Sequence, residues 1–444
     1  MRDILLTAII AVLLVYVLRN ARVGAYLWAW LSLANPHRQT FGFARQLPFA
    51  YLAAIFTLVS LLNPKNRRPF PVTGITVVQI LFLFWMTVTS VFALDAWDAV
   101  QDRWIFVMKI HLMIFVTMML IRGREQIVQL VWVVALSVGF YGVKGGIFTL
   151  LTGGGQRVWG PAGSLLEGNN ELGVALVMIV PLLYFMYQTV AQRWLKWGMI
   201  FCFLTCCMAI LGTQSRGALL ALLAMAAVLG FKGKRPVLTT AMLGLLVVLA
   251  IAFMPDSWTT RMDSIQDFRQ DESAMARLYT WQTLWNLALD RPLVGAGFGT
   301  DKPMIYALYG PAQVGGYTFG RVYVAHSIYF QALGEHGFPG LFLYLLLGVT
   351  TWRTANRIAR QTKDDPEFST WVPLLMRAVQ VSLAGFAVGG AFLTLVHLDL
   401  TYYFVCFVVL VDATLKERVA SAQSQGPATE KVGGGGVGRS GKRV

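Results

Sequence analysis

The sequence predicts an all-α, polytopic integral membrane protein. Of its 444 residues, 56% are apolar and only 13% are charged, whereas about a quarter of the residues in an ordinary soluble domain carry charge. Apolar runs close to the length needed to cross about 30 Å of hydrocarbon recur along almost the whole chain. These runs lack the period-two alternation of a membrane barrel, and backbone groups in lipid must be hydrogen-bonded within their own segment, so we expect helices.

The expected number of membrane-spanning helices is about twelve, with thirteen allowed. The uncertainty comes from residues 3–34, where Arg19-Asn-Ala-Arg22 interrupts the apolar pattern and fits either one broken helix or two short ones. The other expected spans are 45–62, 73–93, 104–121, 125–151, 171–190, 196–213, 216–231, 237–254, 337–353, 372–393 and 398–414.

The basic residues predict the orientation, because Lys and Arg accumulate in short cytoplasmic loops. The loops 94–103 and 152–170 hold only Arg103 and Arg157 as basic residues. The turn at 213–216 and the segment 255–336 are then expected on the same, non-cytoplasmic side. The net charge of +15 is therefore a topology signal, and it gives no reason to consider nucleic-acid binding. The residues expected on the cytoplasmic side are Lys65, Arg67, Arg68, Arg122, Arg124, Arg193, Lys196, Lys232, Lys234, Arg235, Arg353, Arg357, Arg360, Lys363, Lys416 and Arg418.

The segment 255–336 is too long for a plain connection, and part of it has helical periodicity. Apolar residues recur at Leu278, Trp281, Trp285 and Ala288, which predicts an amphipathic helix lying on the membrane surface. Asp290-Arg-Pro ends this helix, and GAGFGT at 295–300 predicts a flexible turn. No strand pattern flanks these glycines, so a dinucleotide-binding site is not expected.

Arg216 is the first candidate for chemistry, because it stands at the head of an apolar helix. An arginine within a span costs about 3 kcal/mol on insertion scales, and such residues usually pair or line a wet cavity. At a helix end it can also act as a snorkelling interface anchor. Arg103, Arg277, Arg321 and His326 are expected on the same membrane face. Several guanidinium groups there would suit a phosphate or pyrophosphate on a lipid-borne anionic substrate.

Lys144, near a helix end, is a further cation, although it can also snorkel or pair with a nearby acid. Asn170 closes the Gly-, Pro- and Asn-containing loop 152–170. We therefore predict a substrate-binding set of Arg103, Lys144, Asn170 and Arg321.

His326 is the candidate for proton transfer or for positioning an attacking hydroxyl, because a neutral imidazole accepts a proton near physiological pH. The alternative is a structural histidine at the interface, and His336 and His397 keep that interpretation. Glu167 and Glu335, both beside glycines on the non-cytoplasmic side, are candidate bases or cap residues, and local structural roles are favoured for both.

No metal and no cofactor are predicted, because the chain has neither a D-x-D pair nor an H-x-x-x-H spacing. The four cysteines fall inside expected helices and are interpreted as small apolar residues, without disulfides. No cleavable signal peptide is expected.

Several short motifs occur in a recognisable order: TQSRGAL at a helix start, an arginine on a loop helix, RPLVGAGFGT, and AHSIYFQALGEHGFPG entering a span. In this order they resemble the bacterial O-antigen ligase and polymerase superfamily, most closely its O-antigen ligases. RNARVGAYLWAWLSLANPHR also resembles O-glycosylation ligases of exosortase-associated systems. The likeness reaches about residue 414. One departure is Ser327, where many relatives have Asn.

The resemblance implies a helical, lipid-donor glycosyltransferase of GT-C-like architecture in the bacterial inner membrane. Such an enzyme moves polysaccharide from undecaprenyl diphosphate to lipid A-core at the periplasmic face, without a metal and with inversion. By position, Arg216, Arg277 and His326 match the family's catalytic residues. The expected parts are the N-terminal transmembrane helices 1–254, a periplasmic loop 255–336, the C-terminal helices 337–414 and a disordered basic tail 415–444.

Three other functions stay open at this point. An O-antigen polymerase and a protein O-oligosaccharyltransferase would use the same donor chemistry. A lipid-carrier transporter or flippase also needs many helices and a cationic cavity, but no internal repeat is evident. Gly142-x-x-x-Gly146 and Gly385-x-x-x-Gly389 are expected to pack helices, either within one chain or between two.

Overall fold

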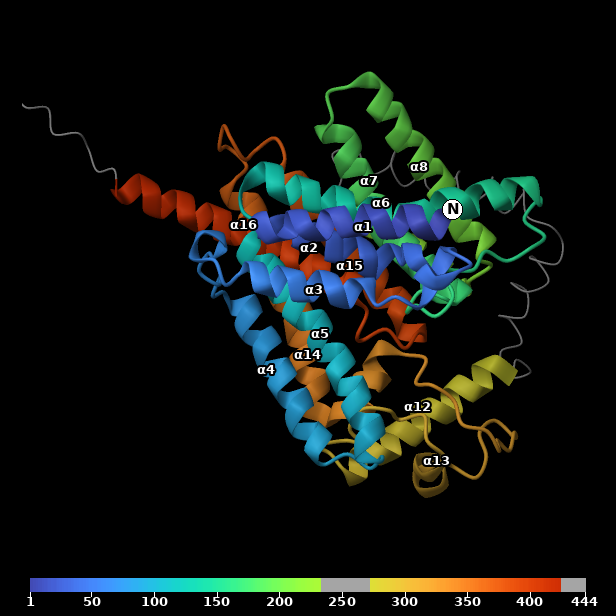
Figure 1. The fold of residues 1–444 in the computed structure, drawn as a ribbon. Helices are drawn as coiled ribbons and strands as arrows, with labels where there is room; N and C mark the ends of the chain where they lie inside the picture. Colours follow the sequence, from blue (N-terminus) through green and yellow to red (C-terminus); the bar gives the residue numbers. More distant parts are fainter. Residues whose placement is uncertain (233–271, 425–444) are drawn as a thin grey trace, which may run out of the picture.

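The computed structural model describes residues 1–232 and 272–424 (Figure 1). Within these residues the regular secondary structure is helical. The α-helices are α1 Arg2–Arg19, α2 Ala21–Ala34, α3 Phe49–Ser60, α4 Gly74–Val91, α5 Trp97–Leu120, α6 Gly123–Leu151, α7 Asn169–Thr189, α8 Arg193–Gly212, α9 Arg216–Lys232, α12 Glu272–Asp290, α13 Pro303–Tyr309, α14 Ile328–Gln361, α15 Val372–Gly389 and α16 Asp399–Ser424. Four short 3-10 turns are η1 Pro36–Gln39, η2 Phe43–Gln46, η3 Pro64–Asn66 and η4 Gly390–Phe392.

A multi-pass membrane protein is confirmed. In the described part of the chain, seven helices are long and apolar enough to cross a membrane, namely α4 to α8, α14, and α15 with the turn that follows it. The total of about twelve stays a prediction, because the expected span 237–254 lies outside the described residues. The N-terminal stretch consists of two helices that meet at Asn20, whose extended backbone (φ −143°, ψ 93°) ends α1 and begins α2.

Small residues bring the membrane helices into close contact within this one chain. A side chain at Gly142 would collide with the Cys206 sulfur, and one at Gly146 would lie 2.1 Å from the Thr205 carbonyl oxygen, so α6 and α8 approach at backbone distance. Gly385 and Gly389 similarly let α15 pack against α7 and α9. The two predicted small-residue motifs therefore act inside the fold, where dispersion contacts replace the hydrophobic effect.

The loops form two separate sets of contacts. In one set, the Leu94 N–H donates to the Ala296 carbonyl (2.8 Å) and the Asn169 side chain donates to the Thr213 carbonyl (2.8 Å). In the other set, Arg122 pairs with Glu417 (2.8 Å). The first two contacts join segments that the basic residues predict to be non-cytoplasmic, and the third joins segments predicted to be cytoplasmic; the orientation itself stays a prediction.

Helix α16 continues past residue 414, where the tail was expected to begin. Lys416 pairs with Asp412 one turn earlier (2.9 Å), and Arg418 pairs with Asp365 (2.9 Å). The first pair stabilises the extra turns within the helix and the second holds them against the loop between α14 and α15, and the helix is described to Ser424. Residues 425–444, the rest of the predicted tail, lie outside the described residues.

Helix α14 is broken at Gly337, whose backbone (φ 66°, ψ −172°) is not helical. The break leaves carbonyl groups of α14 without a donor from the helix itself. The 295–297 turn supplies N–H donors to two of these carbonyls. The Ala296 N–H donates to Gly334 (2.8 Å) and the Gly297 N–H donates to Glu335 (2.9 Å). The glycines of GAGFGT therefore dock a turn onto a helix break, since a Cβ at residue 295 would lie 2.5 Å from the Gly334 oxygen.

Candidate active site

His326 lies in the loop that enters α14, and its backbone is held in the left-handed region at φ 46°. Its N–H donates to the Thr394 hydroxyl (2.9 Å), which ties it to the turn after η4. Ser327 is the N-cap of α14, and its hydroxyl accepts from the Tyr329 and Phe330 N–H groups. The backbone of His326 is thus held by the chain on both sides.

Arg277 lies on α12, which the structure confirms as a helix ending at Asp290. Its guanidinium acts electrostatically on both the His326 imidazole and the Glu171 carboxyl at the start of α7. Trp281, one turn further along α12, donates from its indole N–H to the Ala325 carbonyl (3.0 Å). Its ring also stacks on Phe330, with centroids 5.3 Å apart and planes 7° from parallel. Helix α12 is therefore fixed beside the residues that flank His326.

Arg216 is the first residue of α9. Ser215 precedes it and caps the helix, accepting from the Ala218 N–H (3.2 Å). Gln214 takes a left-handed backbone (φ 54°) and donates to the Gly154 carbonyl (3.0 Å). A cation at the positive end of a helix is unfavourable by about 0.3–1 kcal/mol. The same arrangement becomes favourable when an anion binds there, because the guanidinium charge and the positive end of the helix both attract it.

Residues 389–394, between α15 and α16, are the point on which these three segments converge. Next to Arg216, a Cβ on Gly217 would lie 3.8 Å from the Gly389 carbonyl oxygen and 3.8 Å from Phe392. The Trp281 ring of α12 lies 6.4 Å from the Phe392 ring. Through the Thr394 hydroxyl the same turn holds His326.

Burial lowers the pKa of His326 to about 4, and the nearby Arg277 guanidinium lowers it further in the same direction. The imidazole is therefore neutral at physiological pH and keeps one nitrogen lone pair. Two arginines and a neutral histidine form a set that can bind an anion and accept a proton from a hydroxyl.

The four predicted substrate-binding residues do not all lie together. Arg103 pairs with Asp301 (3.0 Å) and so joins α5 to the turn after the GAGFGT segment. Arg321 is exposed in the loop before His326, and Asn170 is in the first turn of α7. Lys144 is exposed on α6, and no contact in the described chain links it to this centre.

The sequence does not identify four acidic or imidazole side chains as part of a site: it gives no role to one and predicts structural roles for the other three. Glu171 lies within electrostatic reach of Arg277, and its only sequence signal is its place after Asn169-Asn170 at a helix start. Glu335, His336 and His397 form a buried cluster instead of isolated interface residues. The adjacency of the first two is visible in the sequence, but the approach of His397 is not.

An apolar groove of about 360 Å³ begins beside this centre and runs between α14, α15 and α16. Its lining includes Ile328 and Tyr329, directly after the α14 cap, and Arg353 further along the same helix. A groove of this kind suits a long hydrocarbon chain.

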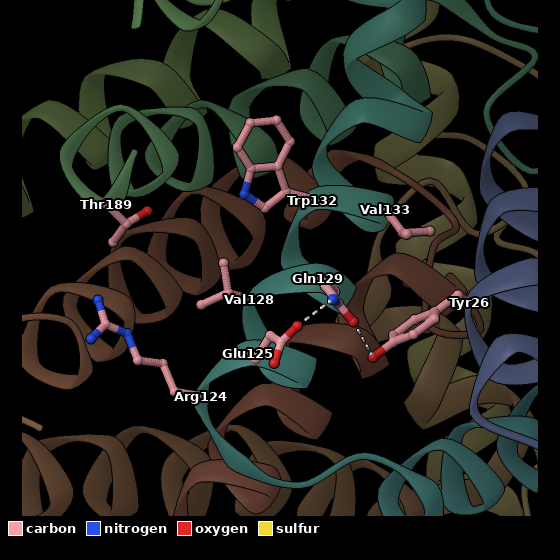
Figure 2. A pocket seen from close by; sticks show the side chains of 8 residues that line it. All are labelled: Tyr26, Arg124, Glu125, Val128, Gln129, Trp132, Val133 and Thr189. Carbon is pink, nitrogen blue, oxygen red and sulfur yellow. Dashed lines mark hydrogen bonds between the residues drawn. The ribbon is translucent and has the colours of Figure 1, made fainter. Parts of the chain in front are cut away.

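A hollow of about 770 Å³ lies away from this centre, between Tyr26 of α2, the start of α6 and the end of α7. Figure 2 shows Gln129 between Glu125 and Tyr26, bonded to each, with Arg124 apart from them. Arg124 belongs to the loops predicted to be cytoplasmic. The volume of a hollow therefore does not by itself identify the active site in this protein.

Two family models match the chain. Residues 201–345 match the family described as O-Antigen ligase, and residues 1–191 match a family of unknown function (DUF5935). A comparison with curated proteins finds no match. Residues 201–345 are thus similar to the O-antigen ligase domain, which ligases and polymerases share. Arg216, Arg277 and His326 all fall within it.

Proposed function

We propose that the protein is an O-antigen ligase. It transfers polysaccharide en bloc from undecaprenyl diphosphate to a sugar hydroxyl of lipid A-core, at the periplasmic face of the bacterial inner membrane. The observation that supports the proposal is that the segments carrying Arg216, Arg277 and His326, all within the matched residues 201–345, contact residues 389–394 through Gly217, Trp281 and the His326 N–H. Lipid-linked glycans are the substrates that this domain implies.

The donor's diphosphate is bound by Arg216 and Arg277, helped by the positive end of α9. Its polyprenyl tail lies in the groove between α14, α15 and α16, whose apolar lining begins beside the same centre. The charged diphosphate and the apolar tail of the donor therefore bind in separate places, as an amphiphilic molecule requires. This division supports a lipid-linked substrate over a soluble nucleotide sugar.

The acceptor hydroxyl is positioned and deprotonated by His326. Its oxygen attacks the anomeric carbon while the bond from that carbon to the phosphate oxygen breaks, so the configuration is inverted. The proton passes to the unprotonated ring nitrogen of His326, and the electron pair of the broken bond leaves on the diphosphate. The two guanidinium groups stabilise that charge, which is the role a metal would otherwise serve.

Reconstitution of the purified chain with a labelled lipid-linked glycan tests the proposal. We expect product on lipid A-core, and a loss of about 10²–10³ in rate for Arg216→Ala, Arg277→Ala or His326→Ala. Arg45→Ala, at an exposed arginine of η2, is the matched control and should react at the wild-type rate. Wild-type rates in the three site variants would contradict the assignment.

A polymerase is the second candidate, because ligases and polymerases share the matched domain. Elongation of the lipid-linked donor itself, without transfer to lipid A-core, would identify it. Transfer to a Ser or Thr peptide would instead identify a protein O-oligosaccharyltransferase. Movement of the carrier across vesicles with no new glycosidic bond would identify a transporter.

A further inference from the structure

We infer that Glu335, His336 and His397 form a binding site for one divalent transition-metal ion of the zinc class. The three residues each offer one ligand atom, and these atoms lie within 4.8 Å of one another. The inference concerns the frame of the protein and does not depend on the transfer reaction. It rests on the geometry of the cluster, on the tautomer of His336 and on how the three side chains are held.

The cluster is centred on one carboxylate oxygen. Glu335 Oε2 lies 3.0 Å from His397 Nε2 and 3.7 Å from His336 Nε2. The side chains are 4%, 13% and 0% exposed for Glu335, His397 and His336. A buried carboxylate needs a compensating charge or hydrogen bonds. Two imidazoles and a carboxylate are a ligand set that zinc accepts.

Thr89 fixes which nitrogen of His336 carries the proton. The single hydroxyl hydrogen of Thr89 is donated to the Met86 carbonyl (3.0 Å), so its oxygen accepts from His336 Nδ1–H at 2.7 Å. His336 Nε2 is then the unprotonated nitrogen, and it has no hydrogen-bond partner among the described residues.

The lone pair of His336 Nε2 consequently lies beside the negatively charged Glu335 oxygen, in a place closed to water. Two electron-rich atoms in that position repel one another unless a cation lies between them. A metal-binding imidazole usually donates its other ring N–H to an oxygen acceptor, and the Thr89 hydroxyl oxygen is such an acceptor here. The pairing of Thr89 with His336 therefore indicates a metal ligand.

The surrounding chain holds the ligands rigidly at the α14 break. The His336 carbonyl accepts from the Trp85 indole N–H (2.9 Å), and the Glu335 carbonyl accepts from the Gly297 N–H. The Phe298 ring packs against both imidazoles, with centroids at 4.9 and 5.4 Å. Gln331 accepts from the Val396 N–H (3.0 Å), which sets the residue before His397.

The ion would join α14 to the loop before α16, and through Thr89 to α4. Glu335 follows His326 by nine residues, or roughly 13 Å along a helix. The ion is therefore too far away to touch groups that react at His326. Its role is to clamp the broken helix that carries His326 at its start.

The purified full-length chain in detergent tests this site without measuring activity. After treatment with a chelator, the protein is loaded with Zn²⁺, freed of excess metal, and examined for bound zinc and for its Tm. We expect about one zinc per chain and a higher Tm with zinc. Glu335→Gln and His397→Leu should lose both the retained zinc and the zinc-dependent rise.

Two further variants keep the test decisive if those fold poorly. His397→Cys restores a zinc ligand and should retain zinc. Thr89→Val keeps all three ligands but removes the orienting bond, and should weaken zinc binding about 10–100-fold. As a control, the double variant Cys202→Ser, Cys206→Ser removes two thiols of α8 that lie outside the cluster, and it should leave the amount of retained zinc unchanged.

Co²⁺ gives an independent readout, since its visible absorption reports bound nitrogen ligands and should disappear in His397→Leu. Equal zinc retention in wild type, Glu335→Gln and His397→Leu would overturn the inference. So would a wild-type protein that retains no zinc after loading, in which case the three side chains share a proton instead of a metal.

Discussion

The backbone of His326 shows how a single residue is positioned for chemistry. A left-handed backbone costs a non-glycine residue about 1–3 kcal/mol and persists only where the surroundings enforce it. Here φ is 46°, and the bond to the Thr394 hydroxyl and the Ser327 cap enforce it. Such strain is typical of functional sites, and its position agrees with the predicted catalytic histidine.

The pH dependence of the reaction should follow the pKa of His326. Because this pKa is lowered to about 4, the imidazole accepts a proton throughout the neutral range, and activity should fall only as the pH drops through about 4. Arg277→Gln removes one cause of the shift, so the acid limb should move up toward 6.5, the ordinary value. The profile of kcat/KM against pH measures both.

The overall rate of Arg277→Gln will also fall, because the arginine binds the donor, so the informative result is the shape of the profile. Arg45→Ala should keep the wild-type profile. A wild-type acid limb near 6.5 would show that His326 is not the titrating base.

Ser327 gives a second prediction for a single residue. Its hydroxyl caps α14, and Asn caps helices about equally well. Ser327→Ala should lower the free energy of unfolding by about 1 kcal/mol, whereas Ser327→Asn should leave it close to wild type. Thermal unfolding of the purified variants compares them, and equal losses in both would mean that the cap is not the reason for this residue.

Among the elements, the sequence predicts the helices better than it predicts the faces that they bury. The pattern Leu278, Trp281, Trp285 correctly marks α12 as a helix. Yet Leu278 is 38% and Trp285 is 46% exposed, and the buried face includes Met275 and Tyr279 instead. Periodicity identifies the apolar side of a helix. Because apolar side chains are favourable both at a membrane surface and in a protein core, the pattern does not show whether that side contacts lipid or protein.

The contact between α6 and α8 yields a prediction for an element. Gly146→Ala places a Cβ 2.1 Å from the Thr205 carbonyl oxygen, so the two helices must separate, at a cost of about 1–3 kcal/mol. Gly198→Ala, on α8 with open space around it, is the control and should be neutral or slightly stabilising. Unfolding in detergent measures both. An unchanged Gly146→Ala protein would mean that the helices do not approach as closely as described.

For the whole molecule, local patterns predict which stretches are helices but not which distant side chains meet. The basic residues predict which loops share a side of the membrane, and this stays a prediction. By contrast, residue type, predicted membrane face and resemblance point to Arg216, Arg277 and His326, but nothing in their spacing indicates that residues 389–394 join the segments that carry them. The approach of His397 to Glu335 depends on the break in α14 and on the packing of Phe298, which are long-range features.

The orientation of the chain in the membrane is the last prediction, and cysteine labelling tests it. The four native cysteines are buried, so background labelling should be low. Gln313→Cys lies in the exposed loop before His326, and Arg193→Cys lies at the exposed start of α8, among the residues predicted to be cytoplasmic.

With a membrane-impermeant maleimide on spheroplasts, Gln313→Cys should be labelled at once, and Arg193→Cys only after permeabilisation. The physical reason is that basic loops are retained in the cytoplasm. The reverse pattern would put Arg216, Arg277 and His326 on the cytoplasmic side, where a donor already flipped across the membrane could not reach them.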